Sequence, residues 1–419
     1  MVAAYSPKSL DRSLLAALPK ADLHVHLDGS LRLETLLELA KERSVELPSR
    51  SSEGMRRLVF KRAYKNLPEY LRGFEFTVAC LQDAEALERA AYELCLDCQA
   101  ENCHYLEVRF APQLHAHPGF PLRDVLRAVA KGLERGRKHA DRDPEVKNGT
   151  KPPFRCGIIV CAMRFFLPVF SQHYRAFFET MAHARPEQIY AAASLELARA
   201  AVRAREDDGL PVVGFDLAGQ ERGFPAADHA EAYQLVHEHF LGKTVHAGED
   251  YGPESIFQAI TVCHADRIGH GTWLMRKGRI QDKSIVDRDR YVEELVRYVA
   301  DRRITLEVCL TSNQQTLPEF RDKLHLHPFR LMRKAKVSTA LCTDNRLVSR
   351  TTCTDEIEKA VKVFKLTPSE VKNTLIYGFK RSFFPGSYRE KREYVRQVLD
   401  RIETLFDERG MNVRAGAAD

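Results

Sequence analysis

Three histidines and one aspartate occupy separate segments of the 419-residue chain and have the side chains that bind metal ions. They are His24 and His26 in ADLHVHLDG, His246 in KTVHAGED and Asp344 in ALCTDN. On a strand, the i, i+2 spacing of His24 and His26 directs both imidazoles to the same side. Three neutral imidazoles and one carboxylate match the ligand preferences of zinc and leave a position open for water. The His-x-His pair alone also fits two hydrogen-bonded core histidines, and the whole set fits a buried ion-pair network without metal.

Two further residues beside this set could move protons. Glu249 follows His246 by three residues, and His270 lies in the segment RIGHG. A carboxyl group and an imidazole next to an activated water are typical of a metal-centred hydrolytic site. The alternatives are a salt bridge from Glu249 to a nearby Arg or Lys, and a core histidine between two glycines.

Eight compact apolar segments alternate with helical ones, and this pattern predicts a closed parallel (β/α)8 barrel, the TIM barrel fold. Four of the residues named above fall at or just past the carboxyl ends of these segments, where barrel enzymes assemble their active sites: His246, Glu249, His270 and Asp344. The predicted strands cover residues 23–27, 105–111, 157–163, 212–218, 244–248, 267–271, 304–310 and 337–343.

Apolar residues at three- and four-residue intervals predict the helices between the strands. We expect one metal-dependent hydrolase domain over 1–419, with its core at about 18–390. Residues 61–82 follow the first helix and predict a helical lid, with ordinary packing as the alternative. Polar residues 139–153 predict a surface loop on the opposite face. The other predicted helices are 33–43, 83–102, 122–140, 192–204, 226–240, 290–303 and a terminal one within 389–406.

Composition excludes several classes of protein. Lys and Arg number 64 against 58 Asp and Glu, and both signs are interspersed, so no basic stripe for nucleic acid is expected. No apolar run approaches the ~18 residues of a membrane span. The ten cysteines stand mostly singly in apolar runs, which favours free thiols in the cytoplasm. We expect a small-molecule substrate and a monomer.

The motifs HVHLDGS, FDLAGQE, HAGED, RIGHGT, TSNQQT and STALCTDN resemble, in order and spacing, those of the adenosine deaminase family, most closely its bacterial type. The resemblance extends from about Leu18 to Phe384. It implies a barrel with one zinc ion that hydrolyses the 6-amino group of adenosine, and of 2′-deoxyadenosine, in purine salvage. By this similarity, the zinc ligands are His24, His26, His246 and Asp344. Glu249 is then the proton donor, and His270 and Asp344 handle the attacking water.

The same resemblance implies the substrate contacts, which are His26, Asp28, Gly219 and Asn345. Asp28 matches the partner of the ribose 5′-hydroxyl and would repel a 5′-phosphate, although it also fits a helix cap, a role for which Ser30 competes. Gly219 matches a glycine whose N–H contacts purine N3. Asn345 replaces an aspartate found in many members, but its amide can donate to purine N7.

Three other functions fit parts of the pattern. The chain could deaminate another 6-aminopurine nucleoside, such as aminodeoxyfutalosine or a modified adenosine. The lid, residues 61–82, would then determine which nucleoside is the substrate. It could be a non-catalytic nucleoside-binding protein, or an amidohydrolase acting on a cyclic amide. Glu107, Arg109, Arg164 and Asp216, on three of the predicted strands, are expected to form a buried charge network that supports the site.

Overall fold

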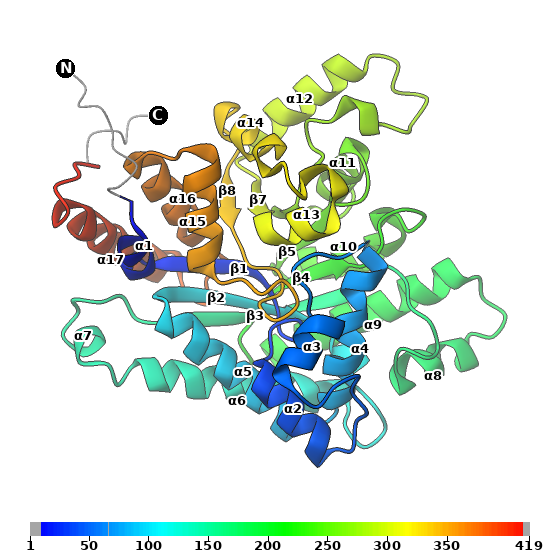
Figure 1. Ribbon diagram of the computed structural model, residues 1–419. Helices are drawn as coiled ribbons and strands as arrows, with labels where there is room; N and C mark the ends of the chain where they lie inside the picture. Colours follow the sequence, from blue (N-terminus) through cyan, green and yellow to red (C-terminus); the bar gives the residue numbers. More distant parts are fainter. Residues whose placement is uncertain (1–9, 66, 414–419) are drawn as a thin grey trace.

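The computed structural model describes residues 10–65 and 67–413, and its centre is a barrel of eight parallel strands (Figure 1). Neighbouring strands pair in sequence order from β1 to β8. The barrel closes where His26 N donates to Asp344 O at 2.8 Å and Asp344 N donates to His24 O at 2.8 Å. The predicted (β/α)8 barrel is therefore confirmed. The strands are β1 Lys20–His26, β2 Cys103–Phe110, β3 Arg155–Met163, β4 Val212–Ala218, β5 Gly242–Ala247, β6 Arg267–His270, β7 Thr305–Val308 and β8 Thr339–Leu341.

The strands form because their β-branched and apolar side chains are buried on both faces of the sheet. Every residue of β2 is buried, and in β3 only the two end residues are partly exposed. Continuous burial of this kind is typical of parallel sheets covered by helices.

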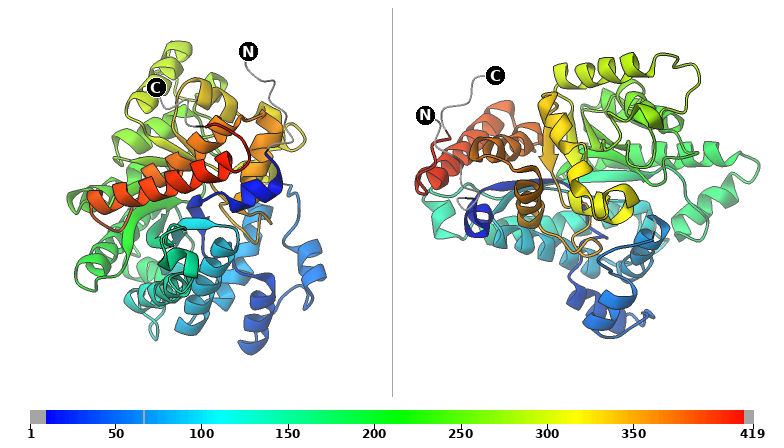
Figure 2. Two further views of the ribbon diagram at one scale, coloured as in Figure 1. Left: turned by 90° about the vertical axis from the view of Figure 1, so that its left-hand side faces the viewer. Right: turned by 45° about the horizontal axis from the view of Figure 1, so that its top comes forward.

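Helices cover the outside of the barrel, as the views in Figure 2 show. The predicted helices are confirmed, with two larger differences in their limits. The helix predicted over 192–204 belongs to a longer one that begins at Pro186, and residues 226–240 begin as a 3-10 turn, Ala226–His229, before the α-helix starts. The helices are α1 Arg12–Ala17, α2 Leu33–Glu42, α3 Ser52–Leu58, α4 Leu67–Cys80, α5 Ala84–Ala100, α6 Leu122–Ala140, α7 Pro144–Lys147, α8 Gln172–Thr180, α9 Pro186–Glu206, α10 Ala230–Glu238, α11 Pro253–Thr261, α12 Arg288–Asp301, α13 Leu310–Thr316, α14 Phe329–Lys334, α15 Cys353–Phe364, α16 Pro368–Arg381 and α17 Tyr388–Asp407.

The segment predicted as a lid is helical and lies at the carboxyl ends of the strands. Residue 66 is outside the described residues, and α4 follows it. The Tyr70 hydroxyl on α4 is 2.8 Å from Ser349 Oγ and accepts a hydrogen bond of 2.7 Å from Asn345 Nδ2. These contacts hold α4 against the loop that follows β8.

Residues 141–154 join α6 to the amino end of β3, so they lie at the opposite end of the barrel from the lid. The predicted surface loop contains one short helix, α7, that was not predicted, and Figure 1 shows it at the edge of the molecule. The predicted terminal helix is α17, and its Tyr394 hydroxyl donates to His104 O at 2.7 Å. No helix in the described part of the chain is long and apolar enough to cross a membrane.

Candidate functional site

The four predicted metal ligands converge at the mouth of the barrel. His24 and His26 lie on β1, His246 lies on β5, and Asp344 follows β8. One ligand atom from each lies within 4.8 Å of those of the other three. His26 Nε2 is 3.2 Å from His246 Nε2, and Asp344 Oδ1 is 3.5 Å from Nε2 of both His24 and His26. The barrel thus brings together residues 320 positions apart, from 24 to 344.

The arrangement fits a bound cation. His24 Nε2 is buried and has no hydrogen-bond partner, which is costly unless something binds it. Burial lowers the pKa of His26 and His246, so both rings are neutral and offer lone pairs. Burial alone would raise the pKa of Asp344, but His24, whose Nε2 lies 3.5 Å from Asp344 Oδ1, and the other neighbouring imidazoles lower it. The site therefore presents nitrogen lone pairs and one carboxylate to a common point, as a metal ion requires.

Two buried carboxylates fix the orientation of the imidazoles. His24 Nδ1 donates to Glu307 Oε2 at 2.8 Å, and His246 Nδ1 lies 3.1 Å from Asp216 Oδ2. A proton on each Nδ1 leaves Nε2 free to bind metal, which is the usual carboxylate–histidine–metal arrangement. Asp216 was among the predicted supporting residues. Glu307 was missed, although a glutamate inside the apolar strand ITLEVCL was a visible signal.

The predicted charge network exists around Arg109. This buried guanidinium donates to Asp216 and Glu307, both at 2.8 Å. Arg267, which was not predicted, donates to Glu307 at 2.7 Å and also to Glu107. Three of the four predicted members therefore belong to one network.

Arg164 is the exception among the four. It donates to two backbone carbonyls, Phe224 O and His246 O, each at 2.7 Å, and to no carboxylate among the described residues. Its place in the charge network was a wrong prediction, because Arg164 lies just past β3 and directs its guanidinium to the backbone of Phe224 and of His246 on β5 instead.

We expect Arg109→Met to lower the free energy of unfolding by about 3–5 kcal/mol, because it leaves Asp216 and Glu307 with less compensation in the protein interior. Urea denaturation followed by circular dichroism measures the change. Arg123→Met is the matched control, since Arg123 pairs with Asp208 while its own side chain is 60% exposed, and we expect a loss below about 1 kcal/mol. Equal losses in the two variants would contradict the assigned role of the network.

His270 and Asp344 share an unusual backbone conformation. Their φ angles are +63° and +62°, in the left-handed region that residues other than glycine rarely adopt. Such strain is concentrated at functional sites. Here the turn at each strand end directs the side chain into the barrel mouth, where the His24 and His270 ring centroids are 5.0 Å apart.

Glu249 lies beside His270, with 3.6 Å between Glu249 Oε2 and His270 Nε2. Burial, followed by the negative charges of Asp344 and Glu221, raises the pKa of Glu249 well above its usual range. A carboxyl group in this environment retains its proton at higher pH than an exposed glutamate and can act as an acid.

Two residues that sequence reasoning missed support this pair. Glu221 accepts hydrogen bonds from the backbone N–H of Gly248 at 2.9 Å and of Glu249 at 2.7 Å, which fixes the loop after β5. Asn313 Nδ2 is 3.2 Å from His270 Nδ1. Both lie in segments already singled out, FDLAGQE and TSNQQT, but their partners lie in distant parts of the chain, in the loop after β5 and on β6.

The predicted substrate residues lie around the same mouth. Asp28 is buried just past β1, and Gly219 follows β4 with φ +102°, a conformation that requires glycine. Asn345 Nδ2 donates to Tyr70 Oη, so one of its two amide hydrogens is already used by the lid. Asn345 Oδ1 is buried without a hydrogen-bond partner and lies against Gly29. A Cβ atom added to Gly29 would be only 1.9 Å from this oxygen.

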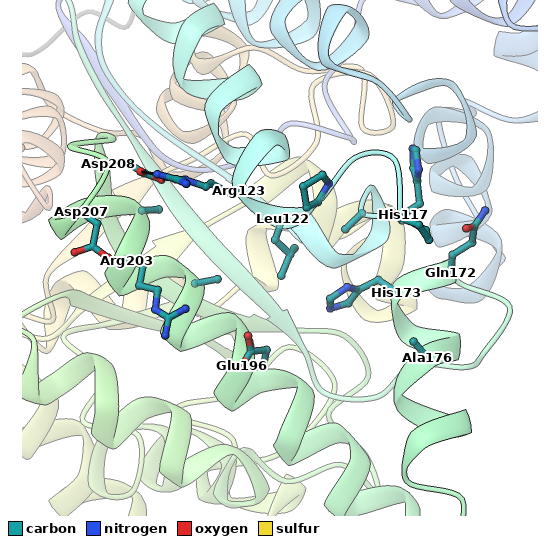
Figure 3. A pocket seen from close by; sticks show the side chains of 15 residues that line it. His117, Leu122, Arg123, Gln172, His173, Ala176, Glu196, Arg203, Asp207 and Asp208 are labelled. Atoms are coloured by element: carbon teal, nitrogen blue, oxygen red, sulfur yellow. Dashed lines mark hydrogen bonds and ion pairs between the residues drawn. The ribbon is translucent and has the colours of Figure 1, made fainter.

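A separate cavity of about 710 Å³ lies on the flank of the barrel and holds none of these residues (Figure 3). It is bounded by the loop after β2 and by parts of α6, α8 and α9. Its lining mixes His117, His173 and Arg203 with Glu196 and Asp207. Because it lacks the converging ligands, we do not assign the chemistry to it.

Comparisons with known proteins agree with this geometry. The family model described as "Adenosine deaminase" matches residues 19–402. The chain is 34% identical over 385 residues to "Adenosine deaminase" of Mycobacterium marinum, covering 91% of this chain and 94% of the relative. It is 32% identical to "Probable adenosine deaminase" of Dictyostelium discoideum, covering 95% of this chain but only 45% of that longer protein. Among solved structures, adenine deaminase from Arthrobacter aurescens superposes with a TM-score of 0.71 at 22% identity, covering 92% of this chain and 99% of that one.

Proposed function

The chain belongs to the adenosine deaminase family, and from this premise we propose that it hydrolyses adenosine to inosine and ammonia. We include 2′-deoxyadenosine as a substrate, because the one sugar contact that we assign is to the 5′-hydroxyl and no contact is assigned to the 2′-hydroxyl. The observation that carries the proposal is the set of four converging ligands with Glu249 and His270 beside them.

We propose that the metal is zinc, one ion per chain, held by His24, His26, His246 and Asp344. Nitrogen and oxygen ligands in this ratio suit zinc, and the buried, unpartnered Nε2 of His24 supports a site made for a cation. Zinc, when bound there, supplies the Lewis acidity that activates water for attack near neutral pH.

The chain's own residues supply the proton transfers. Glu249 in its protonated form donates to purine N1, which reduces the aromatic character of the C6=N1 bond and makes C6 electrophilic. His270 and the second oxygen of Asp344 accept the proton of the attacking water and orient it. The raised pKa of Glu249 supports this role, because the acid form must persist at the working pH.

Substrate recognition is assigned to the residues around the ligands. His26 borders the bound base, Gly219 N–H contacts purine N3, and the remaining amide hydrogen of Asn345 donates to N7. Asp28 accepts a hydrogen bond from the ribose 5′-hydroxyl and disfavours a 5′-phosphate by charge repulsion.

All ten cysteines are unpaired and buried, which supports a reducing compartment. We therefore place this purine salvage reaction in the cytoplasm. That the chain works as a monomer stays a prediction.

The proposal is tested by following the loss of ultraviolet absorbance with adenosine, 2′-deoxyadenosine, adenine and AMP in parallel, with and without a chelator. We expect the two nucleosides to react, AMP to remain unchanged, and the chelator to stop the reaction. Reaction of AMP alone would contradict the role of Asp28, and inertness of every compound would contradict the proposed function.

A further inference from the structure

Behind the predicted sugar site, the His115 imidazole faces Asp28, with Nε2 3.9 Å from Asp28 Oδ2. We propose that His115 is a positioning residue that holds Asp28 for the ribose 5′-hydroxyl and so determines the preference for substrates with a free hydroxyl there. The inference rests on the proposed function and adds a residue to it.

The imidazole ring of His115 is held in place by its surroundings. It follows the short 3-10 helix Pro112–Leu114 after β2, and its side chain is fully buried. Its Nδ1 donates to Leu81 O at 2.8 Å, and its ring packs on Phe110 with 5.8 Å between the centroids. Gln113 fixes the preceding turn by donating to Ala193 O at 3.0 Å. The ring therefore has one orientation, with Nε2 as its remaining polar atom.

Nε2 is buried and has no hydrogen-bond partner. The atom it faces belongs to a carboxylate whose other oxygen, Asp28 Oδ1, is also buried and unpartnered. The side chain of Asp28 is only 4% exposed. Among the residues that the structure describes, His115 is the only one with a basic side-chain nitrogen within 4.0 Å of the Asp28 carboxylate.

A buried carboxylate without hydrogen bonds is unfavourable unless a ligand or a cationic neighbour compensates it. The substrate's 5′-hydroxyl compensates the carboxylate by donating a hydrogen bond to it. Because His115 Nδ1 already donates to Leu81 O, a second proton on Nε2 makes the ring an imidazolium, and in that form it attracts the carboxylate across the 3.9 Å gap. Without that nitrogen, no basic side chain among the described residues lies within ion-pair distance of Asp28, and its contact with the substrate weakens.

The experiment compares adenosine with 5′-deoxyadenosine, which lacks only the hydroxyl in question. The full-length, metal-loaded wild type is measured beside His115→Asn, His115→Gln, Asp28→Ala and the Asp28→Ala/His115→Asn double variant. In His115→Asn the amide stays near the Nδ1 position and can still donate to Leu81 O. In His115→Gln the amide reaches toward the Nε2 position and can still donate to Asp28.

We expect the ratio of kcat/KM for adenosine over 5′-deoxyadenosine to fall about tenfold in His115→Asn, through a higher KM for adenosine. His115→Gln restores most of the ratio. The double variant has the same ratio as Asp28→Ala, because His115 acts through Asp28. If His115→Asn does not fold, as judged by circular dichroism, His115→Met, which fills the ring volume without a polar atom, is expected to show the same loss.

A variant that lowers kcat/KM for both substrates by the same factor would mean that His115 only supports the fold, and would overturn the inference. A further fall of the ratio in the double variant would overturn it as well. These failures differ from failure of the proposed function, in which the wild type itself would not deaminate adenosine.

Discussion

Glu249→Gln is expected to lower kcat by about a thousandfold while the protein keeps its metal. The amide has nearly the same shape as the carboxyl group but cannot transfer a proton to the purine. Metal content should be unchanged, because Glu249 is not one of the converging ligands. The measurements are steady-state kinetics with adenosine and elemental analysis of the same preparation.

The matched control is Asp250→Asn, the next residue of the same loop, whose side chain lies 3.9 Å from Arg222 at the surface. We expect it to change kcat less than threefold or so, since surface substitutions have small effects. Near-normal turnover in Glu249→Gln, or an equal loss in both variants, would remove the assignment of Glu249 as the acid.

The pH dependence follows from the same residue. The pKa of Glu249 is raised, so its protonated form, which is the active one, predominates to higher pH than in an exposed glutamate. The rate should therefore fall as pH rises through this raised pKa. Its signature is a descending limb in the profile of kcat against pH that is absent in Glu249→Gln.

Asp344→Asn is expected to remove both the metal and the activity. Asparagine tolerates the positive φ at this position, so the fold should survive. The substitution removes the negative charge that faces His24 and His26 at 3.5 Å, and with it the one anionic ligand. We expect a fall in kcat of at least about a thousandfold.

The control for this variant is the chelated wild type, which should regain activity when zinc is added back, whereas Asp344→Asn should not. Retention of stoichiometric metal and of turnover in Asp344→Asn would contradict its assignment as ligand and base.

Much of the fold could be predicted from the sequence because the barrel repeats one simple pattern. Strands such as GIIVCAM are buried on both faces and alternate with amphipathic helices, so their type and order follow from hydrophobic periodicity alone. The limits of short elements could not be predicted in the same way. Residues 304–310 have the composition of one strand, yet β7 ends at Val308 and α13 begins at Leu310, because contacts from the neighbouring strands decide where the ladder stops.

The convergence of His24, His26, His246 and Asp344 could be predicted because each stands on or just past a strand in a distinctive segment. Glu307, Asn313, Tyr70 and His115 could not, since their roles depend on which side chain faces them across the barrel. Strand register decides that Glu307 on β7 meets His24 on β1, 283 residues away. The left-handed turn that aims His270 at the site also has no signature in the sequence beyond the glycines around it.

We propose that one divalent ion binds between β1, β5 and the end of β8 and makes the reaction possible. The most direct test is elemental analysis of natively purified protein, with deaminase activity measured on the same sample. We predict one zinc ion per chain, lost together with activity on chelation. Full activity in material that contains no stoichiometric transition metal would contradict the account.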